Sequence, residues 1–312
     1  MSDKIPLLVI NTLLPQHQAQ IGALYELHHA PDDKDRAAVI AAHGARIRAV
    51  LTIGVTGISE AEVAQLPNLE LVCCLGAGFE RLPMAALRAR GIVTANGAGT
   101  NDDSVADHAL GLLIASVREM RKLDRLCREG VWRDAIAQPR NVSGKKLGIL
   151  GLGTIGQKIA RRAQAFDMEI GYHNRSPRAG VPHRYFDSVL ALAQWCDFLV
   201  CAAPGGPATR HLIDAQVLRA LGPDGFLVNI GRGSTVDTEA LAHALREGLI
   251  AGAGIDVYES EPQRPELLIG LDNLLLTPHV AGWSPEATQA SVDRFLANAQ
   301  GHFAGRGVVS PI

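Results

Sequence analysis

Three ionisable side chains stand where chemistry is expected, each shortly after a predicted strand. Arg232 lies in NIGRGSTVD, Glu261 in DVYESEP and His279 in LLLTPHVAGWS. Because parallel strands bring their carboxyl ends to one edge of a sheet, we expect the three side chains to lie together. An arginine can bind a carboxylate in a fork and polarise the carbonyl beside it. A histidine can transfer a proton near neutral pH, and a glutamate can orient its ring, so the set suits reduction of a 2-oxo acid.

Each of these side chains also has a plainer interpretation. Arg232 stands between glycines and fits a surface loop, while Glu261 precedes a proline and fits a solvated acid. A histidine after a proline, as at His279, is often structural. The other histidines have no comparable setting and no role is assigned to them, among them His28, His29, His108 and His211.

The stretch LGILGLGTIGQKIARRAQAFDMEIGYHNRS combines a strand, a glycine turn, a helix and a second strand. This order is typical of a dinucleotide-binding unit. Gly151 permits a tight turn, Gly153 lets backbone approach a pyrophosphate, and Gly156 lets the helix pack closely on the strand. Thr154 and Ile155 begin the helix, whose first N–H groups would face the phosphates. A purely structural glycine turn is the alternative.

The end of the second strand bears on the choice of cofactor. NAD-binding units usually place an acidic residue there, on the ribose 2′-hydroxyl. Here the sequence reads Asn174-Arg175-Ser176, and an arginine beside a hydroxyl and an amide can bind a 2′-phosphate. We therefore expect a preference for NADP(H). NAD(H) stays possible because Asn174 could bind an unphosphorylated ribose, and an ordinary polar loop is the alternative.

Composition limits the class of protein. A chain of 312 residues with 47% hydrophobic and 20% charged residues suits a globular α/β protein of roughly two domains. A formal charge of -2 gives no electrostatic case for binding nucleic acid or an anionic membrane, and no apolar run reaches membrane-spanning length. The five cysteines match no metal motif, so we expect no metal. Their place in apolar runs, and the lack of a signal-like N-terminus, predict a cytoplasmic protein with reduced thiols.

Strand and helix signals alternate through most of the chain, which predicts parallel sheets covered by helices. Residues 96–101 form a candidate hinge between two domains. A long helix is predicted over residues 104–129, with a charged second half that leaves the core. A final helix is predicted from Ser284 to about Phe303. The fold class is therefore α/β, with two Rossmann-like or flavodoxin-like parallel-sheet domains and a cleft between them.

The chain resembles the D-2-hydroxyacid dehydrogenase family. The matching segments are LGAGFERL, NGAGTNDDSVADHALGLLIA, GLGTIG, NIGRGSTVDTEAL, GAGIDVYESEP and NLLLTPHVAGWS, in that family's order. The resemblance implies a discontinuous substrate-binding domain, residues 1–98 plus 285–312, and a dinucleotide-binding domain, residues 99–284. It also implies homodimerisation, including the charged arm after Arg118.

The resemblance further implies roles for individual residues. Arg232, Glu261 and His279 would form the catalytic triad. Leu75, Gly76 and Ala77 would help hold the substrate carboxylate. Independently of the resemblance, Trp283 beside His279 is a candidate specificity residue that leaves room for an aromatic-walled pocket. The implied cofactor contacts are Asp256 on the nicotinamide amide, Val105 against the nicotinamide ring, and Ala203 and Pro204 near the adenosine.

The expected function is thus an NADP(H)-dependent D-2-hydroxyacid dehydrogenase that reduces small 2-oxo acids, glyoxylate or hydroxypyruvate. The Asn-Arg-Ser turn in place of the usual acid resembles the NADP-preferring glyoxylate and hydroxypyruvate reductase branch. One alternative is a reductase of aryl-pyruvates or sugar-derived 2-keto acids on the same fold. Another is a nucleotide-sensing protein without turnover.

Overall fold

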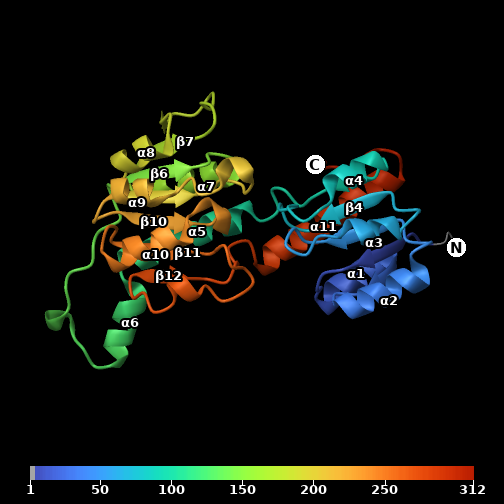
Figure 1. Cartoon of the computed structure of the whole chain (residues 1–312), viewed down its shortest axis with the longest axis horizontal. Coiled ribbons are helices and arrows are strands. Elements are labelled where there is room, and N and C mark those ends of the chain that lie inside the picture. Colours follow the sequence, from blue (N-terminus) through green and yellow to red (C-terminus); the bar gives the residue numbers. More distant parts are fainter. Residues whose placement is uncertain (1–3) are drawn as a thin grey trace. The chain divides into compact units, whose positions relative to one another are not determined.

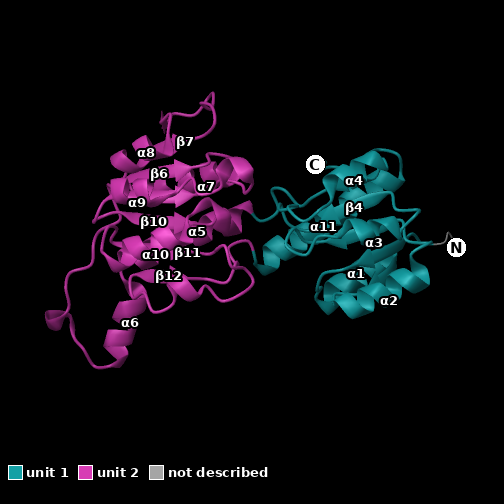
Figure 2. Ribbon diagram, viewed as in Figure 1, with its two compact units in different colours: residues 1–101, 283–312 teal, residues 102–282 magenta. Residues whose placement is uncertain are grey.

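The computed structural model describes residues 4–312, which form two compact units (Figure 2). Unit 1 takes the chain up to residue 101 together with residues 283–312, and unit 2 is residues 102–282. No helix in the described part of the chain is long and apolar enough to cross a membrane.

Unit 1 is built on a five-stranded parallel sheet with the strand order β2-β1-β3-β4-β5 (Figure 1). Its strands are β1 (Pro6–Val9), β2 (Glu26–His29), β3 (Ala49–Thr52), β4 (Leu71–Cys74) and β5 (Val93–Ala95). Its helices are α1 (Pro15–Leu24), α2 (Asp33–His43), α3 (Glu60–Ala64), α4 (Met84–Ala89) and α11 (Pro285–Phe303). Leu7 and Val9 pack into one apolar cluster and Leu8 into another, so the sheet is buried on both faces.

The last helix explains why unit 1 is discontinuous in sequence. Val292, Phe295 and Ala299 of α11 are buried in the same cluster as Leu7 and Val9 of β1. Ser284 caps the helix by accepting a hydrogen bond from the backbone N–H of Ala287, 3.1 Å away. The end of the chain therefore completes the core that its beginning starts.

Unit 2 is built on a seven-stranded parallel sheet with the order β12-β11-β10-β9-β6-β7-β8. Its strands are β6 (Lys146–Leu150), β7 (Glu169–His173), β8 (Arg184–Tyr185), β9 (Phe198–Cys201), β10 (Phe226–Asn229), β11 (Gly252–Ile255) and β12 (Leu274–Leu276). Its helices are α5 (Asp102–Val117), α6 (Met120–Arg128), α7 (Thr154–Gln164), α8 (Val189–Trp195), α9 (Ala215–Leu221) and α10 (Thr238–Arg246). Short 3-10 turns are η1 (Arg133–Ala135), η2 (Pro207–Thr209), η3 (Gly233–Thr235) and η4 (Glu266–Leu268).

The order of strands in unit 2 reverses beside β6. The chain moves from β6 to β7 and β8 on one side, then returns to β9 on the other side. Open parallel sheets bind ligands outside the strand carboxyl ends at such a switch point. The topology therefore places the expected cofactor site next to the glycine turn.

Two sequence-based predictions of elements were wrong. The helix predicted over residues 104–129 is two helices, because Glu119 adopts a left-handed conformation (φ 50°) that breaks the helix between α5 and α6. The apolar and polar residues over 16–27 predict one helix, but the structure ends α1 at Leu24 and begins strand β2 at Glu26. It is an edge strand that pairs only with β1, and its Glu-Leu-His-His sequence lacks a strand signal.

Candidate active site

The glycine turn lies between β6 and α7, and at two of its glycines a side chain would meet backbone atoms. Gly151 has a φ of +96°, and a Cβ there would lie 2.8 Å from the backbone N of Ala203. A Cβ on Gly156 would lie 2.2 Å from the carbonyl oxygen of Gly151, so the helix could not pack as it does. A Cβ on Gly153 would meet nothing within 4 Å, which leaves open space at the start of α7. Thr154 and Ile155 are the first residues of α7, whose leading N–H groups have no acceptor within the helix.

The turn after β7 is tied to the glycine turn. The side-chain oxygen of Asn174 accepts a hydrogen bond from the backbone N–H of Leu152 at 2.8 Å. The buried Tyr172 hydroxyl accepts from the backbone N–H of Arg178 at 2.8 Å, which fixes the far side of the turn. Between these anchors, Arg175 and Ser176 are exposed. The segment predicted to bind a 2′-phosphate is therefore held beside the helix N-terminus with its arginine open to solvent.

The segment after β9 completes the edge of the sheet around this turn. Ala203 is buried against Gly151, and Pro204 is exposed. Val105 is buried in the apolar cluster that α5 shares with β6 and α7. Most of the predicted cofactor residues of unit 2 thus come from three neighbouring segments, with Val105 contributed by the covering helix and Asp256 by the end of β11.

Arg232 follows β10 on a loop that the side chain of Asn229 stabilises. The side chain of Asn229 donates to the carbonyl oxygen of Arg232 at 3.1 Å and accepts from the N–H of Gly231 at 3.0 Å. The guanidinium of Arg232 donates to the carbonyl oxygen of Gly231 at 2.7 Å. Asn229 is fully buried, so this loop is set by the end of its strand.

Glu261 and His279 form a hydrogen-bonded pair. The Nδ1 atom of His279 lies 2.7 Å from Oε2 of Glu261. The hydrogen bond with Glu261 raises the pKa of His279 above its ordinary value, although partial burial and the charge of Arg232 oppose the rise. The structure therefore pairs Glu261 with His279, and Arg232 follows a neighbouring strand at the same edge of the sheet.

Asp256 holds the backbone next to His279. Its Oδ1 accepts from the Thr277 hydroxyl at 2.6 Å and from the N–H of Val280 at 2.9 Å, and its Oδ2 accepts from the N–H of Ala281 at 2.9 Å. The N–H of His279 donates to the carbonyl oxygen of Asp256 at 2.8 Å. Asp256 is 1% exposed, so these donors are what keep its charge stable in the interior.

Two residues of this network, His108 and Thr277, were missed by sequence reasoning. Nε2 of His108, on α5, lies 3.0 Å from the hydroxyl of Thr277 and 3.6 Å from Oδ1 of Asp256. No role was assigned to His108, because its place on α5 gives no hint that it meets a segment far away in sequence. Only the packing of α5 on β11 and β12 shows that it faces Thr277.

The remaining predicted residues belong to unit 1. Leu75, Gly76 and Ala77 follow β4, where the Gly76 carbonyl accepts from the N–H of Gly97 at 2.9 Å and the Ala77 carbonyl accepts from the Asn96 side chain at 2.7 Å. A Cβ on Gly76 would meet nothing within 4 Å. Trp283, the first residue of the second segment of unit 1, is 76% exposed.

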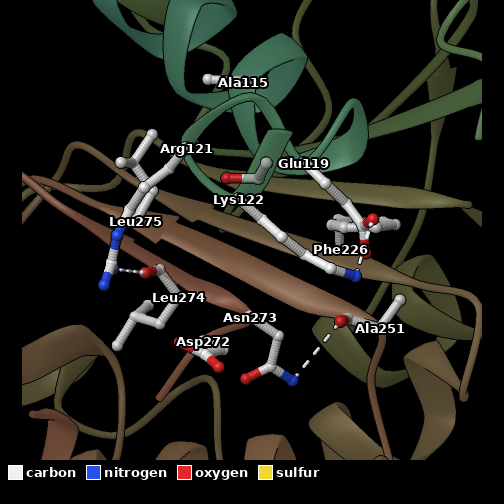
Figure 3. A pocket seen from close by; sticks show the side chains of 11 residues that line it. Ala115, Glu119, Arg121, Lys122, Phe226, Ala251, Asp272, Asn273, Leu274 and Leu275 are labelled. Atoms are coloured by element: carbon white, nitrogen blue, oxygen red, sulfur yellow. Dashed lines mark hydrogen bonds and ion pairs between the residues drawn. The ribbon is translucent and has the colours of Figure 1, made fainter. Parts of the chain in front are cut away.

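Unit 2 has a hollow of about 190 Å³ (Figure 3), which lies away from Arg232, Glu261 and His279. Its lining includes Phe226, Ala251 and Leu274, which stand at the amino ends of β10, β11 and β12. Arg232, Glu261 and His279 follow the carboxyl ends of the same strands. The hollow is therefore at the opposite edge of the sheet, where Arg121 and Lys122 of α6 also line it (Figure 3).

Known proteins match most of this chain. Residues 110–281 match the model of the D-isomer specific 2-hydroxyacid dehydrogenase NAD-binding domain. Glyoxylate/hydroxypyruvate reductase A of Arabidopsis thaliana is 39% identical over 279 residues, 89% of each chain. Hydroxyphenylpyruvate reductase of Plectranthus scutellarioides is 36% identical over 97% of this chain and 96% of its own.

One solved structure bears on the cofactor. The NADPH-dependent glyoxylate/hydroxypyruvate reductase of Sinorhizobium meliloti, in complex with NADP and malonate, superposes with a TM-score of 0.90. It is 34% identical, and the match covers 99% of this chain and 97% of that one.

Proposed function

This chain belongs to the D-isomer specific 2-hydroxyacid dehydrogenase family, and we propose that it reduces glyoxylate or hydroxypyruvate with NADPH. The observation that carries the proposal is the hydrogen-bonded Glu261–His279 pair, at the same edge of the sheet as Arg232 and the glycine turn. These groups can bind a carboxylate and transfer a proton to the oxygen of a neighbouring carbonyl.

In the proposed reaction the guanidinium of Arg232 binds the substrate carboxylate and polarises the C2 carbonyl. When bound, the reduced nicotinamide supplies a hydride for C2. The carbonyl oxygen keeps the electron pair of the broken π bond and takes a proton from Nε2 of His279, which leaves a 2-hydroxy acid. Glu261 holds Nδ1 of the ring and favours its protonated form before the transfer.

The residues present fit a dinucleotide. The open space at Gly153 and the N-terminus of α7 suit a pyrophosphate, and the exposed Arg175 and Ser176 suit a 2′-phosphate. NADPH preference is further supported by the Sinorhizobium enzyme, which is NADPH-dependent. NADH stays a possible second cofactor, because the Asn174 side chain could also face a ribose hydroxyl. Val105, Ala203, Pro204 and Asp256 are proposed to contact the bound cofactor, as the family resemblance implies.

Unit 1 is proposed as the substrate-binding domain and unit 2 as the dinucleotide-binding domain. We assign the backbone of Leu75, Gly76 and Ala77 to the substrate carboxylate. The hydrogen bonds that tie Gly76 to Gly97 and Ala77 to Asn96 support this, because they hold the segment in one conformation.

Reduction of aryl-pyruvates is the second candidate function. It is favoured by the exposed ring of Trp283, and also by the resemblance to hydroxyphenylpyruvate reductase. A small oxo acid does not need an aromatic wall, whereas an aryl side chain gains from one.

A homodimer is proposed from the exposed arm of unit 2. Helix α6 buries none of its own residues, and Trp132 just beyond it is 69% exposed. A second copy of the chain would cover these groups. Sedimentation of the wild type and of a Trp132→Glu variant tests this, because a dimer that uses the arm is expected to weaken in the variant.

A reducing compartment, the cytoplasm, is proposed from the cysteines. All five are free thiols, and Cys73, Cys74, Cys196 and Cys201 are buried. Burial raises the pKa of Cys201 to about 11, so this thiol stays protonated and unreactive near neutral pH.

The test of the proposed function is the initial rate of NADPH oxidation with glyoxylate, hydroxypyruvate, hydroxyphenylpyruvate and 2-ketogluconate. The proposal expects the highest kcat/KM with one of the first two. A higher value with hydroxyphenylpyruvate would favour the aryl alternative. No turnover with any of the four would contradict the assignment.

A further inference from the structure

We propose that His211 and Glu259 are positioning residues that lock together the loops carrying Arg232 and Glu261. The inference rests on the proposed function for what those loops do, but its structural content is independent of it. Sequence reasoning assigned no role to His211 and did not consider Glu259. Neither residue is one of the groups expected to touch substrate or cofactor.

The carboxylate of Glu259 is surrounded by donors from two other segments. Its Oε1 lies 2.8 Å from Nε2 of His211 and 3.4 Å from a guanidinium nitrogen of Arg210. Its Oε2 accepts from the Thr238 hydroxyl at 2.7 Å and from the Thr238 backbone N–H at 3.3 Å. Thr238 is the first residue of α10, so the carboxylate also lies at the positive end of a helix.

The charge of Glu259 is stabilised at this position. Partial burial alone would raise its pKa, but the hydrogen bonds from His211 and Thr238 outweigh burial and the pKa lies below its ordinary value. The group is therefore an anion across the neutral range. It links three segments that follow different strands of the sheet: residues 203–213 after β9, residues 231–238 after β10, and residues 257–261 after β11.

His211 is held in a conformation that a histidine rarely adopts. Its φ is +51°, one of four positive values among the described non-glycine residues, and His279 is another. Its backbone N–H donates to the carbonyl oxygen of Ser234 at 2.8 Å, two residues after Arg232. Backbone strain of this kind persists only where surrounding contacts enforce it, and it is concentrated at functional sites.

The lock acts directly on both catalytic loops. A Cβ on Gly233 would lie 2.1 Å from the carbonyl carbon of Tyr258 and 2.6 Å from the backbone N of Glu259. The loop that carries Arg232 therefore packs directly against the backbone of residues 258–259. The N–H of Tyr258 donates to Oε1 of Glu261 at 2.7 Å. Movement of residues 258–259 would therefore displace Arg232 and release Glu261 from the position in which it holds His279.

Two variants test the lock. Glu259→Gln removes the charge and keeps an acceptor for Thr238. His211→Asn removes the ring at a residue where asparagine tolerates positive φ better than most residues do. Asp224→Asn is the matched control, because it breaks the 2.6 Å ion pair of Asp224 with Arg140 just before β10, at the opposite edge of the sheet.

The readouts are kcat/KM for glyoxylate with NADPH, thermal stability, and the pKa of His279 followed by NMR with the His279→Gln variant as assignment control. The charged groups that influence His279 are Glu261, Arg232 and Asp256, and all three are retained in these variants. His211→Asn removes no anion. If the ring of His211 is neutral, the variant loses no charge. If the ring is protonated, the variant loses a positive charge, which would raise the pKa of His279. A fall in that pKa therefore reports a rearrangement around the His279 ring, as expected if its contact with Glu261 loosens.

We expect kcat/KM to fall about tenfold in each variant, the scale of one lost hydrogen bond to a charged group. The double variant should have about the same kcat/KM as the less active of the two single variants, because the two residues act as one unit. We also expect the pKa of His279 to fall in His211→Asn and to stay unchanged in Asp224→Asn. An unchanged kcat/KM and an unchanged pKa of His279 in His211→Asn would overturn the inference, whatever happens to the melting temperature. If the wild type reduces no 2-oxo acid, the proposed function fails, and the NMR titration still decides whether the lock exists.

Discussion

Nδ1 of His279 and Oε2 of Glu261 lie 2.7 Å apart, and both residues are fixed by further contacts. The other oxygen of Glu261 accepts from the N–H of Tyr258 at 2.7 Å. The backbone of His279 has a φ of +55° and donates to the carbonyl of Asp256. Because Nδ1 is committed to Glu261, Nε2 is the nitrogen that can deliver a proton to a substrate.

Replacing His279 with glutamine should remove the proton donor and keep the fold. We expect kcat for glyoxylate reduction to fall by about 10²–10⁴-fold, the usual contribution of a positioned acid. The dissociation constant of NADPH, measured by fluorescence, should stay the same. His243→Gln, on the exposed face of α10, is the control and should be active. Full turnover by His279→Gln would contradict the mechanism.

Replacing Glu261 with glutamine should change the pH dependence of both directions. The hydrogen bond with Glu261 raises the pKa of His279, so the variant's pKa should be lower. Reduction needs the protonated ring, so its rate falls as pH rises through this pKa, and in the variant it should fall at lower pH. Oxidation needs the neutral ring, so in the variant it should extend to lower pH.

Profiles of kcat/KM against pH for the two directions test this expectation. Glu266→Gln is a suitable control, because Glu266 is exposed and follows in the same connection between β11 and β12. Its profiles should match those of the wild type. Profiles of Glu261→Gln that also match would mean that this carboxylate does not set the pKa of His279.

Replacing Asp256 with asparagine should destabilise unit 2 at the loop that bears His279. Both carboxylate oxygens accept hydrogen bonds, from Thr277, Val280 and Ala281. An amide NH₂ in place of either oxygen faces at least one donor, which leaves a buried donor unpaired at a cost of about 1–3 kcal/mol. Urea unfolding should show this loss, together with lower activity. Asp272→Asn, near the other edge of the sheet, should show neither effect.

Much of this architecture could be predicted because it depends on local patterns. The strand, glycine turn and helix at 147–164 are specified by residues next to each other, and the structure confirms them. The two parallel sheets and the family are also confirmed, by the topology and by the matching relatives. The site roles of individual residues stay predictions.

What could not be predicted depends on contacts between distant segments. His108 meets Thr277 across 169 positions, and His211 meets Glu259 across 48, so no local spacing reveals either pair. The break at Glu119 was hidden because arginine, lysine and glutamate favour helix on both sides of it. Strand β2 was missed because an edge strand with one apolar residue has no alternation to detect.

Replacing Arg175 with alanine should reduce the preference for NADPH. The wild type is expected to favour NADPH over NADH in kcat/KM by about tenfold or more, which corresponds to about 1.4 kcal/mol. Loss of the exposed guanidinium should raise KM for NADPH and leave KM for NADH nearly unchanged. Arg161→Ala removes the same charge from the exposed side of α7 and should keep the preference. Equal kinetics with both cofactors in the wild type would make this turn an ordinary loop.

Two glycines of the turn before α7 should respond differently to alanine. At Gly156 the new Cβ would lie 2.2 Å from the carbonyl oxygen of Gly151, so backbone must move, and we expect a loss of about 1–3 kcal/mol in stability. At Gly153 the Cβ would meet nothing within 4 Å, so the melting temperature should change little. That open space is where a pyrophosphate would approach, so Gly153→Ala should weaken NADPH binding by about tenfold or more. Calorimetry measures both quantities, and a Gly153→Ala protein that binds NADPH as tightly as the wild type would show that the phosphates lie elsewhere.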